Sequence, residues 1–227
     1  MNFKRFSFGC LMVTALFLLT ACGNGSGGDD TSETRFPRAD MSAYDLEEEH
    51  RFFTVTMEEA LELLEEEFEG IIYFGFPGCP YCQAAIPLMH EASQNAGVDI
   101  FYVSRAHDLR EGEWLEWDAE MAWWLYNNGV PYMRWINEDG ELVDVDAEEE
   151  EGYRPNINVP QIIHLREGAV VDTHRGTFEG HVPIGEGDAR HLPELTDSEH
   201  ATLLARYLEI FSAVGVCPLD GDADDCE

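Results

Sequence analysis

The chain has 227 residues, 46 of them acidic and 13 basic, which gives a formal net charge of −33 at pH 7. A charge of this size repels DNA, RNA and anionic membrane surfaces, so nucleic-acid binding is excluded as an expected function. Hydrophobic residues make up 44% of the chain and aromatic residues 11%. The composition therefore predicts a folded core rather than a disordered chain.

The first 22 residues have the pattern of an export signal. Two basic residues precede the apolar run 6–19, which is too short for a stable membrane-spanning helix. The run ends in Leu19-Thr20-Ala21-Cys22, a sequence that resembles the lipoprotein box of bacteria. This resemblance implies that residues 1–21 are a lipoprotein signal peptide and that Cys22 carries the lipid. An ordinary signal peptide with an incidental cysteine is the alternative.

Composition divides the exported part of the chain into three segments. Residues 22–45 are rich in small and polar residues and predict a flexible tether. Residues 46–216 have the length of one domain, and residues 217–227 form an acidic tail. Because exported proteins keep disulfides, we expect Cys217 and Cys226 to form a structural disulfide; a second redox relay is the alternative.

Strands and helices alternate in the first half of the domain. In chain order we expect a strand at 51–55, a helix capped by Thr56 and Glu59 and terminated by Gly70, a buried strand at 71–74, a helix at 80–96 and a strand at 99–104. A strand–helix–strand pattern of this length predicts a parallel βαβ unit.

The second half has fewer regular elements. Residues 111–127 predict a helix, with one apolar face made of Trp114, Trp117, Met121, Trp124 and Leu125. These tryptophans are expected in the core, with an apolar rim for substrates as the alternative. A loop-rich stretch follows, then an antiparallel hairpin over 161–174 and a last helix that begins after Thr196.

The motif that carries chemistry is Cys79-Pro80-Tyr81-Cys82, between the buried strand and its helix. A cysteine at a helix start faces unpaired backbone N–H groups and the positive end of the helix dipole, which lower its pKa. Cys82 lies one turn further on the same face, so it can attack a mixed disulfide formed at Cys79. The pattern predicts an exposed attacking cysteine and a buried resolving cysteine.

Three other interpretations of the motif compete with redox chemistry. The cysteines could form a structural disulfide, although so short a loop stabilises a domain little. They could be half of a zinc site, but the chain has no second C-x-x-C and no paired histidines at ligand spacing. The motif could also be present in the fold without any chemical role. We expect neither a metal nor an organic cofactor.

The segment from Ile71 to Cys82 resembles the strand and active-site turn of the thioredoxin superfamily, and its Cys-Pro-Tyr-Cys tetrad is that of glutaredoxins. Pro87 matches the proline in the active-site helix. Pro160 is followed by Gly168 and Gly176 at the spacing seen in thioredoxin. The chain is most similar to exported thioredoxin-like proteins grouped with bacteriocin transport accessory proteins. The resemblance implies a thioredoxin fold, a central mixed sheet flanked by helices, with a long insertion at about 105–158.

The resemblance also assigns roles to individual residues. It implies that Pro160 is a cis-proline beside Cys79, and that the backbone of Val159 pairs with an extended substrate segment. Pro80 and Tyr81 would tune the reduction potential. Pro131 is a rival for the cis-proline position. One departure is Tyr73, which stands where thioredoxins keep a buried acid.

These features together predict a membrane-anchored, extracytoplasmic thiol–disulfide oxidoreductase that acts through Cys79 and Cys82. Its expected partners are exported proteins that contain cysteine and a redox protein that recycles the pair. The sequence leaves the direction of exchange open. The alternative from another class is a non-enzymatic accessory module that holds secreted peptides in the cis-proline groove.

Overall fold

The computed structural model describes residues 35–46, 49–104, 116–130, 134–137, 142–143, 154–185 and 191–215. The chain divides into two units, Met1–Glu33 and Thr34–Glu227, and the first lies outside the described residues. The signal peptide, Cys22, and the acidic tail with Cys217 and Cys226 also lie outside them, so they stay predictions. Among the helices that are described, none has the length and apolar character to cross a membrane.

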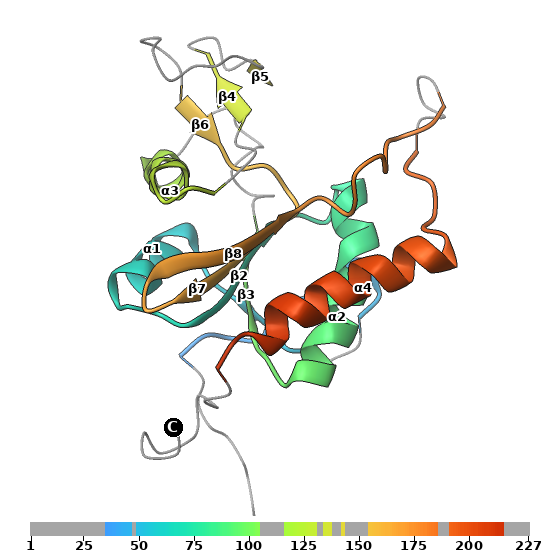
Figure 1. Cartoon of the computed structure of the whole chain (residues 1–227). Coiled ribbons are helices and arrows are strands. Elements are labelled where there is room, and N and C mark those ends of the chain that lie inside the picture. The colour runs from blue at the N-terminus through green and yellow to red at the C-terminus, as the bar shows by residue number, and fades with distance from the viewer. Residues whose placement is uncertain are drawn as a thin grey trace, which may run out of the picture. The chain divides into compact units, whose positions relative to one another are not determined.

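A five-stranded mixed sheet forms the centre of the second unit (Figure 1). Its strands, in the spatial order β1-β3-β2-β7-β8, are β1 (Phe52–Thr54), β3 (Ile100–Ser104), β2 (Gly70–Gly75), β7 (Gln161–Arg166) and β8 (Ala169–Arg175). The first three are parallel, β7 runs antiparallel to β2, and β8 runs antiparallel to β7. The predicted βαβ unit and hairpin are therefore confirmed.

Helices cover both faces of this sheet (Figure 1). On one face α1 (Met57–Glu65) and α3 (Glu116–Asn127) pack together, and on the other α2 (Pro80–Ala96) packs against α4 (Asp197–Ser212). Side chains alternate along each strand, so one core lies under each helix pair. In β2, Tyr73 enters the core under α2 and α4 while Phe74 enters the other. This is the expected thioredoxin fold.

Capping residues explain where two of the helices begin. Thr56 accepts the N–H of Glu59 at 3.1 Å, and its own N–H donates to the Glu59 carboxylate at 2.7 Å. Thr196 and Glu199 make the same reciprocal pair at the start of α4. The first helix ends at Glu65, earlier than expected. Its last turn contains Glu62 and Glu65 and no basic residue, and negative charge is unfavourable at the C-terminal end of a helix dipole.

Residues 35–46 are not part of the tether, so the predicted boundary at residue 45 is wrong. Phe36, Met41 and Tyr44 are buried in the domain. The backbone joins the edge of β1, where the N–H of Ala39 donates to Phe52 at 2.9 Å. The apolar residues of this segment follow no helix or strand period, which is why their burial is not visible in the sequence.

The insertion contains a second sheet where the sequence predicts loops. Its strands β4 (Arg134–Ile136), β5 (Leu142–Val143) and β6 (Arg154–Asn156) are antiparallel in the order β5-β4-β6. Strands of two or three residues are too short to show an alternating pattern. Within the described part of 105–158, α3 packs beside α1, and the three short strands form a sheet of their own.

The tryptophans differ from one another in how far their side chains are buried. Trp124 is partly buried against the core under α1 and α3, as expected. Trp123, which the sequence did not single out, is 39% exposed and packs edge to face on the buried Trp135 of β4, with ring centres 5.9 Å apart. Trp114 and the side chain of Trp117 lie outside the described residues.

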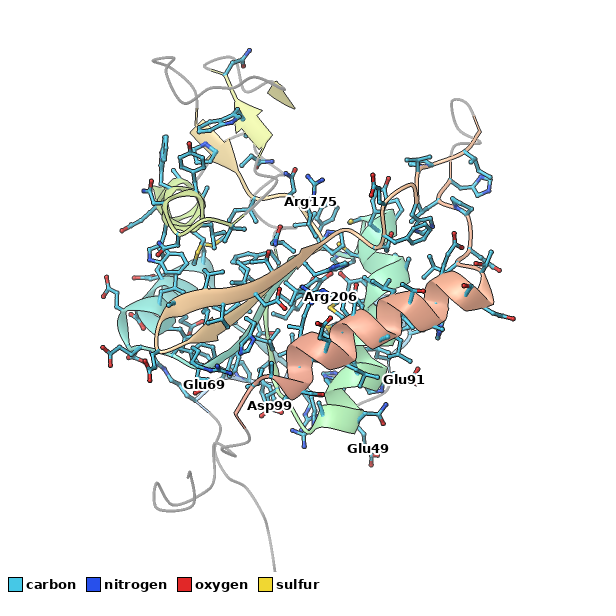
Figure 2. The ribbon with its side chains drawn as sticks, in the orientation of Figure 1. Glu49, Glu69, Glu91, Asp99, Arg175 and Arg206 are labelled. Carbon is cyan, nitrogen blue, oxygen red and sulfur yellow. The ribbon has the colours of Figure 1, made fainter. Side chains whose placement is uncertain are left out.

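Arginines tie separate elements together in this acidic chain. Figure 2 shows Arg206 between α4 and β8, where it contacts Asp172 at 2.5 Å. Arg51 pairs with Asp99 at 2.7 Å. Ion pairs this exposed contribute at most about 1 kcal/mol each, so packing rather than charge holds the layers together.

Two buried histidines, His50 and His164, and the half-buried His174 predict that the fold weakens in acid. Burial lowers the pKa of His50, His164 and His174 below the usual 6.5, and both ring nitrogens of His164 have no hydrogen-bond partner within the described residues. The unfolded chain therefore takes up protons that the folded chain does not. Stability should fall as the pH drops below about 6.5, by at most about 1.4 kcal/mol per histidine per pH unit, until each folded pKa is reached.

Urea unfolding at pH 7.5 and at pH 5.5 tests this prediction. A His164→Leu variant should lose less stability between the two values than the unmodified protein. The exposed His200 offers a matched control, because a His200→Gln variant should keep the full loss. Equal losses in all three proteins would contradict a role for buried histidine.

Candidate active site

The first cysteine of the motif caps the helix that follows it. Cys79 has extended backbone angles, φ −87° and ψ 116°, and its sulfur accepts the N–H of Cys82 at 3.2 Å. Pro80 occupies the first turn, where a missing N–H costs nothing. Both thiols are free. The structure thus places the motif at the start of the helix after β2, as the sequence predicts.

Both cysteines are buried, which differs from the expected exposed attacker. Cys82 has no exposed surface and Cys79 keeps 5%. Phe76, Tyr81 and Val159 are partly buried against the core cluster that contains the two cysteines. The Cys79 thiol is therefore nearly covered and lies among apolar side chains.

The environment shifts the pKa values of the two thiols in opposite directions. The Cys82 thiol lowers the pKa of Cys79, and the N–H groups of Cys82 and Tyr81 act in the same direction, against the effect of burial. Burial raises the pKa of Cys82, and the neighbouring Cys79 raises it further. These directions favour a negative charge on Cys79 over one on Cys82, the order that an attacking and a resolving thiol need.

The cis-proline segment lies beside the first cysteine. The Val159–Pro160 peptide bond is cis, and the Cys79 sulfur lies 4.0 Å from the carbonyl oxygen of Val159. Gly176 donates its N–H to the Pro160 carbonyl at 2.9 Å, with a φ of +71° that suits glycine. The cis bond implied by the resemblance is confirmed. Its rival Pro131 lies outside the described residues.

His181 is a site residue that the sequence analysis missed. Its ring contacts Tyr81 of the motif edge to face, with ring centres 6.1 Å apart, and stacks on Phe178 at 4.9 Å. One ring nitrogen lies 2.6 Å from the Thr177 hydroxyl and the other 2.8 Å from the Pro193 carbonyl. Its contact with Tyr81 joins residues far apart in the sequence, so no local pattern indicates it.

No buried acid lies near the thiols within the part of the chain that the structure describes. Among the residues that the structure describes, every Asp and Glu side chain keeps some exposure, and no three His, Cys, Asp or Glu side chains gather as a metal site. The core cluster that contains Cys82 includes four tyrosines, Tyr44, Tyr73, Tyr102 and Tyr207.

Fold and site together define a thioredoxin-fold protein with a dithiol at the N-terminus of the helix after β2. No family model matches the chain, and no curated protein matches it in sequence. Among solved structures, a thioredoxin from Aeropyrum pernix is similar over 54% of this chain and 73% of its own, with 20% identity and a TM-score of 0.33. A likeness this low adds no argument, so the fold rests on the strand order described above.

Proposed function

We propose that the protein is a thiol–disulfide oxidoreductase that exchanges disulfides with exported proteins through Cys79 and Cys82. The observation that carries the proposal is the placement of two free thiols in one helix turn, where the Cys79 sulfur caps the helix and accepts the N–H of Cys82 at 3.2 Å while Cys82 is fully buried behind it. The position of the Cys79 sulfur near the Val159 carbonyl adds support, because a backbone next to the nucleophile can pair with an extended partner segment. Pro80 and Tyr81 would tune the reduction potential.

The proposed reaction balances as two exchanges. The Cys79 thiolate attacks a partner disulfide, so a Cys79–partner bond forms while the partner's S–S bond breaks, and the released thiolate takes a proton from water. Cys82 then loses its proton to water and attacks the Cys79 sulfur, which forms the Cys79–Cys82 disulfide and frees the second partner thiolate. The dithiol loses two electrons and the partner gains them. The oxidative direction is the reverse.

The proposed location is the extracytoplasmic face of a membrane, with a lipid on Cys22. Support comes from the sequence of residues 1–22 alone. Each turnover changes the redox state of Cys79 and Cys82, so a second redox protein would have to reset the pair. That protein and the exported substrates are the proposed partners.

A second candidate is a non-enzymatic module that holds secreted peptides in the groove beside Pro160. The burial of Cys79 favours it, because a thiol with 5% exposure is a hindered nucleophile. Trapping separates the two functions.

A Cys82→Ala variant should accumulate mixed disulfides between Cys79 and exported proteins, because the resolving thiol is gone. Non-reducing gels followed by mass spectrometry would detect them. The Cys79→Ala/Cys82→Ala variant is the matched control and should trap nothing. Absence of mixed disulfides from the Cys82→Ala variant, with the protein folded, would leave the binding module as the better account.

A further inference from the structure

The hydroxyl of Tyr73 is buried beneath the dithiol without a hydrogen bond. Tyr73 lies in β2, has no exposed surface and belongs to the core cluster that contains both cysteines. Its hydroxyl has no hydrogen-bond partner among the described residues. A buried polar group left unpaired destabilises a fold by about 1–3 kcal/mol, so such a group asks for an explanation.

The surrounding residues hold the Tyr73 ring in one place. It stacks on Tyr102 with ring centres 5.5 Å apart and planes 22° from parallel. Its hydroxyl lies over the backbone of Gly75, so close that a Cβ at that position would be 2.3 Å from the oxygen. The hydroxyl therefore has little freedom to find another partner.

Cys82 belongs to the same core cluster as this hydroxyl. Burial raises the pKa of Cys82 most and Cys79 raises it further, while the Tyr73 hydroxyl and the backbone of Phe76 lower it by smaller amounts. Three other tyrosines face the pair. The hydroxyls of Tyr44 and Tyr102 lie 3.2 Å apart and bond each other. Burial raises the pKa of Tyr207, and Cys82 raises it further through space, without a hydrogen bond between the two. Tyr73 is thus the tyrosine of this group placed to donate to the Cys82 sulfur.

We propose that the Tyr73 hydroxyl donates a hydrogen bond to the Cys82 sulfur when that sulfur is negatively charged, and so makes Cys82 competent to resolve the mixed disulfide. The inference rests on the proposed function and names a further catalytic residue for it. In the neutral dithiol the hydroxyl stays unpaired. The hydrogen bond would form only when the Cys82 thiolate forms, so it would stabilise the reacting thiolate and not the resting thiol.

Tyr73 acts here as a donor and not as a base. Burial raises its own pKa well above the ordinary value, so the hydroxyl keeps its proton throughout. The proton of Cys82 leaves to water, the Cys82–Cys79 bond forms, and the bond from Cys79 to the partner breaks. In the oxidative direction Cys82 is the leaving thiolate, and the same hydrogen bond stabilises it.

A small disulfide reagent tests this without any protein partner. Dipyridyl disulfide is uncharged, so the acidic protein does not repel it. Reaction with Cys79 releases one coloured thione, and attack by Cys82 on the mixed disulfide releases a second. A Tyr73→Phe variant should give the first release within about twofold of the unmodified rate and the second about tenfold more slowly near pH 7, the effect of one hydrogen bond to a charged group.

Tyr207→Phe is the matched control, because it also removes a buried, unpaired hydroxyl from the same core. It should leave both releases within about twofold. The rate of the second release should rise with pH in every protein, with the curve of Tyr73→Phe displaced to higher pH. The melting temperature of Tyr73→Phe should not fall, since the hydroxyl it removes is unpaired in the resting protein.

The outcomes separate this inference from the proposed function. Equal second releases in the Tyr73→Phe and Tyr207→Phe variants would overturn the role of Tyr73, as would a large drop in the melting temperature of Tyr73→Phe. A slower second release in Tyr73→Phe, together with a Cys82→Ala variant that traps no exported protein, would keep Tyr73 as the donor and reject the physiological function.

Discussion

A Cys79→Ser variant is expected to lose disulfide exchange by at least about a thousandfold. The thiolate is the nucleophile, and the Cys82 thiol and the helix N–H groups stabilise it at this position. A serine hydroxyl stays protonated there and forms no mixed disulfide. Reduction of a model disulfide, with dithiothreitol to recycle the pair, gives the rate. Far-ultraviolet circular dichroism should show an unchanged fold.

A Cys82→Ser variant provides the comparison. It should still react once with dipyridyl disulfide through Cys79 and then stop, because nothing resolves the product. A Cys79→Ser variant that retains a tenth or more of the activity would show that Cys82 or another group attacks first. The assignment of the two roles would then be wrong.

The largest effect on stability is expected from a single added methyl group at Gly75. A Cβ there would lie 2.3 Å from the Tyr73 hydroxyl and 2.6 Å from the ring carbon that bears it. The ring is fully buried and stacked, so it cannot swing aside. A Gly75→Ala variant should lose about 3 kcal/mol of unfolding free energy, at the upper end of the usual cost of overpacking. Guanidinium unfolding measures the loss.

A double-mutant cycle identifies the cause. In a Tyr73→Leu background, which lacks the clashing atoms, the cost of Gly75→Ala should fall by about half or more. Gly78→Ala is the matched control. Its Cβ would meet only the Phe76 ring, at 3.3 Å, so its cost should stay below about 1 kcal/mol. Additive costs of the changes at 73 and 75 would exclude the ring as the source of strain.

The regular part of the fold could be predicted because local signals agree there. The second helix has a proline at its start and Gly97 in a left-handed conformation at its end, and its predicted range matches the structure. The central strand is buried along its whole length, as its continuous apolar run indicates. Where helix caps, hydrophobic periodicity and terminating glycine or proline residues agree, the sequence alone predicts the element and its bounds.

The rest depends on contacts between distant residues. The burial of Met41 and Tyr44 against the active-site face follows from where the chain passes, not from a local pattern. In the site, the two cysteines can be recognised from the sequence by their C-x-x-C spacing at the start of a helix. The contact between His181 and Tyr81 joins residues 100 positions apart. The proposed role of the Tyr73 hydroxyl can be seen only in the structure, where Tyr73 and Cys82 share one core cluster.

The docking of residues 35–46 on the domain changes how far the active site could travel from a membrane. With the proposed lipid on Cys22, the predicted tether of residues 22–45 would shorten to residues 22–34. Even fully extended, that length of chain spans about 40 Å rather than about 80 Å. A protein held this way would work on polypeptides close to the bilayer surface, which favours substrates that have just crossed it over those already released.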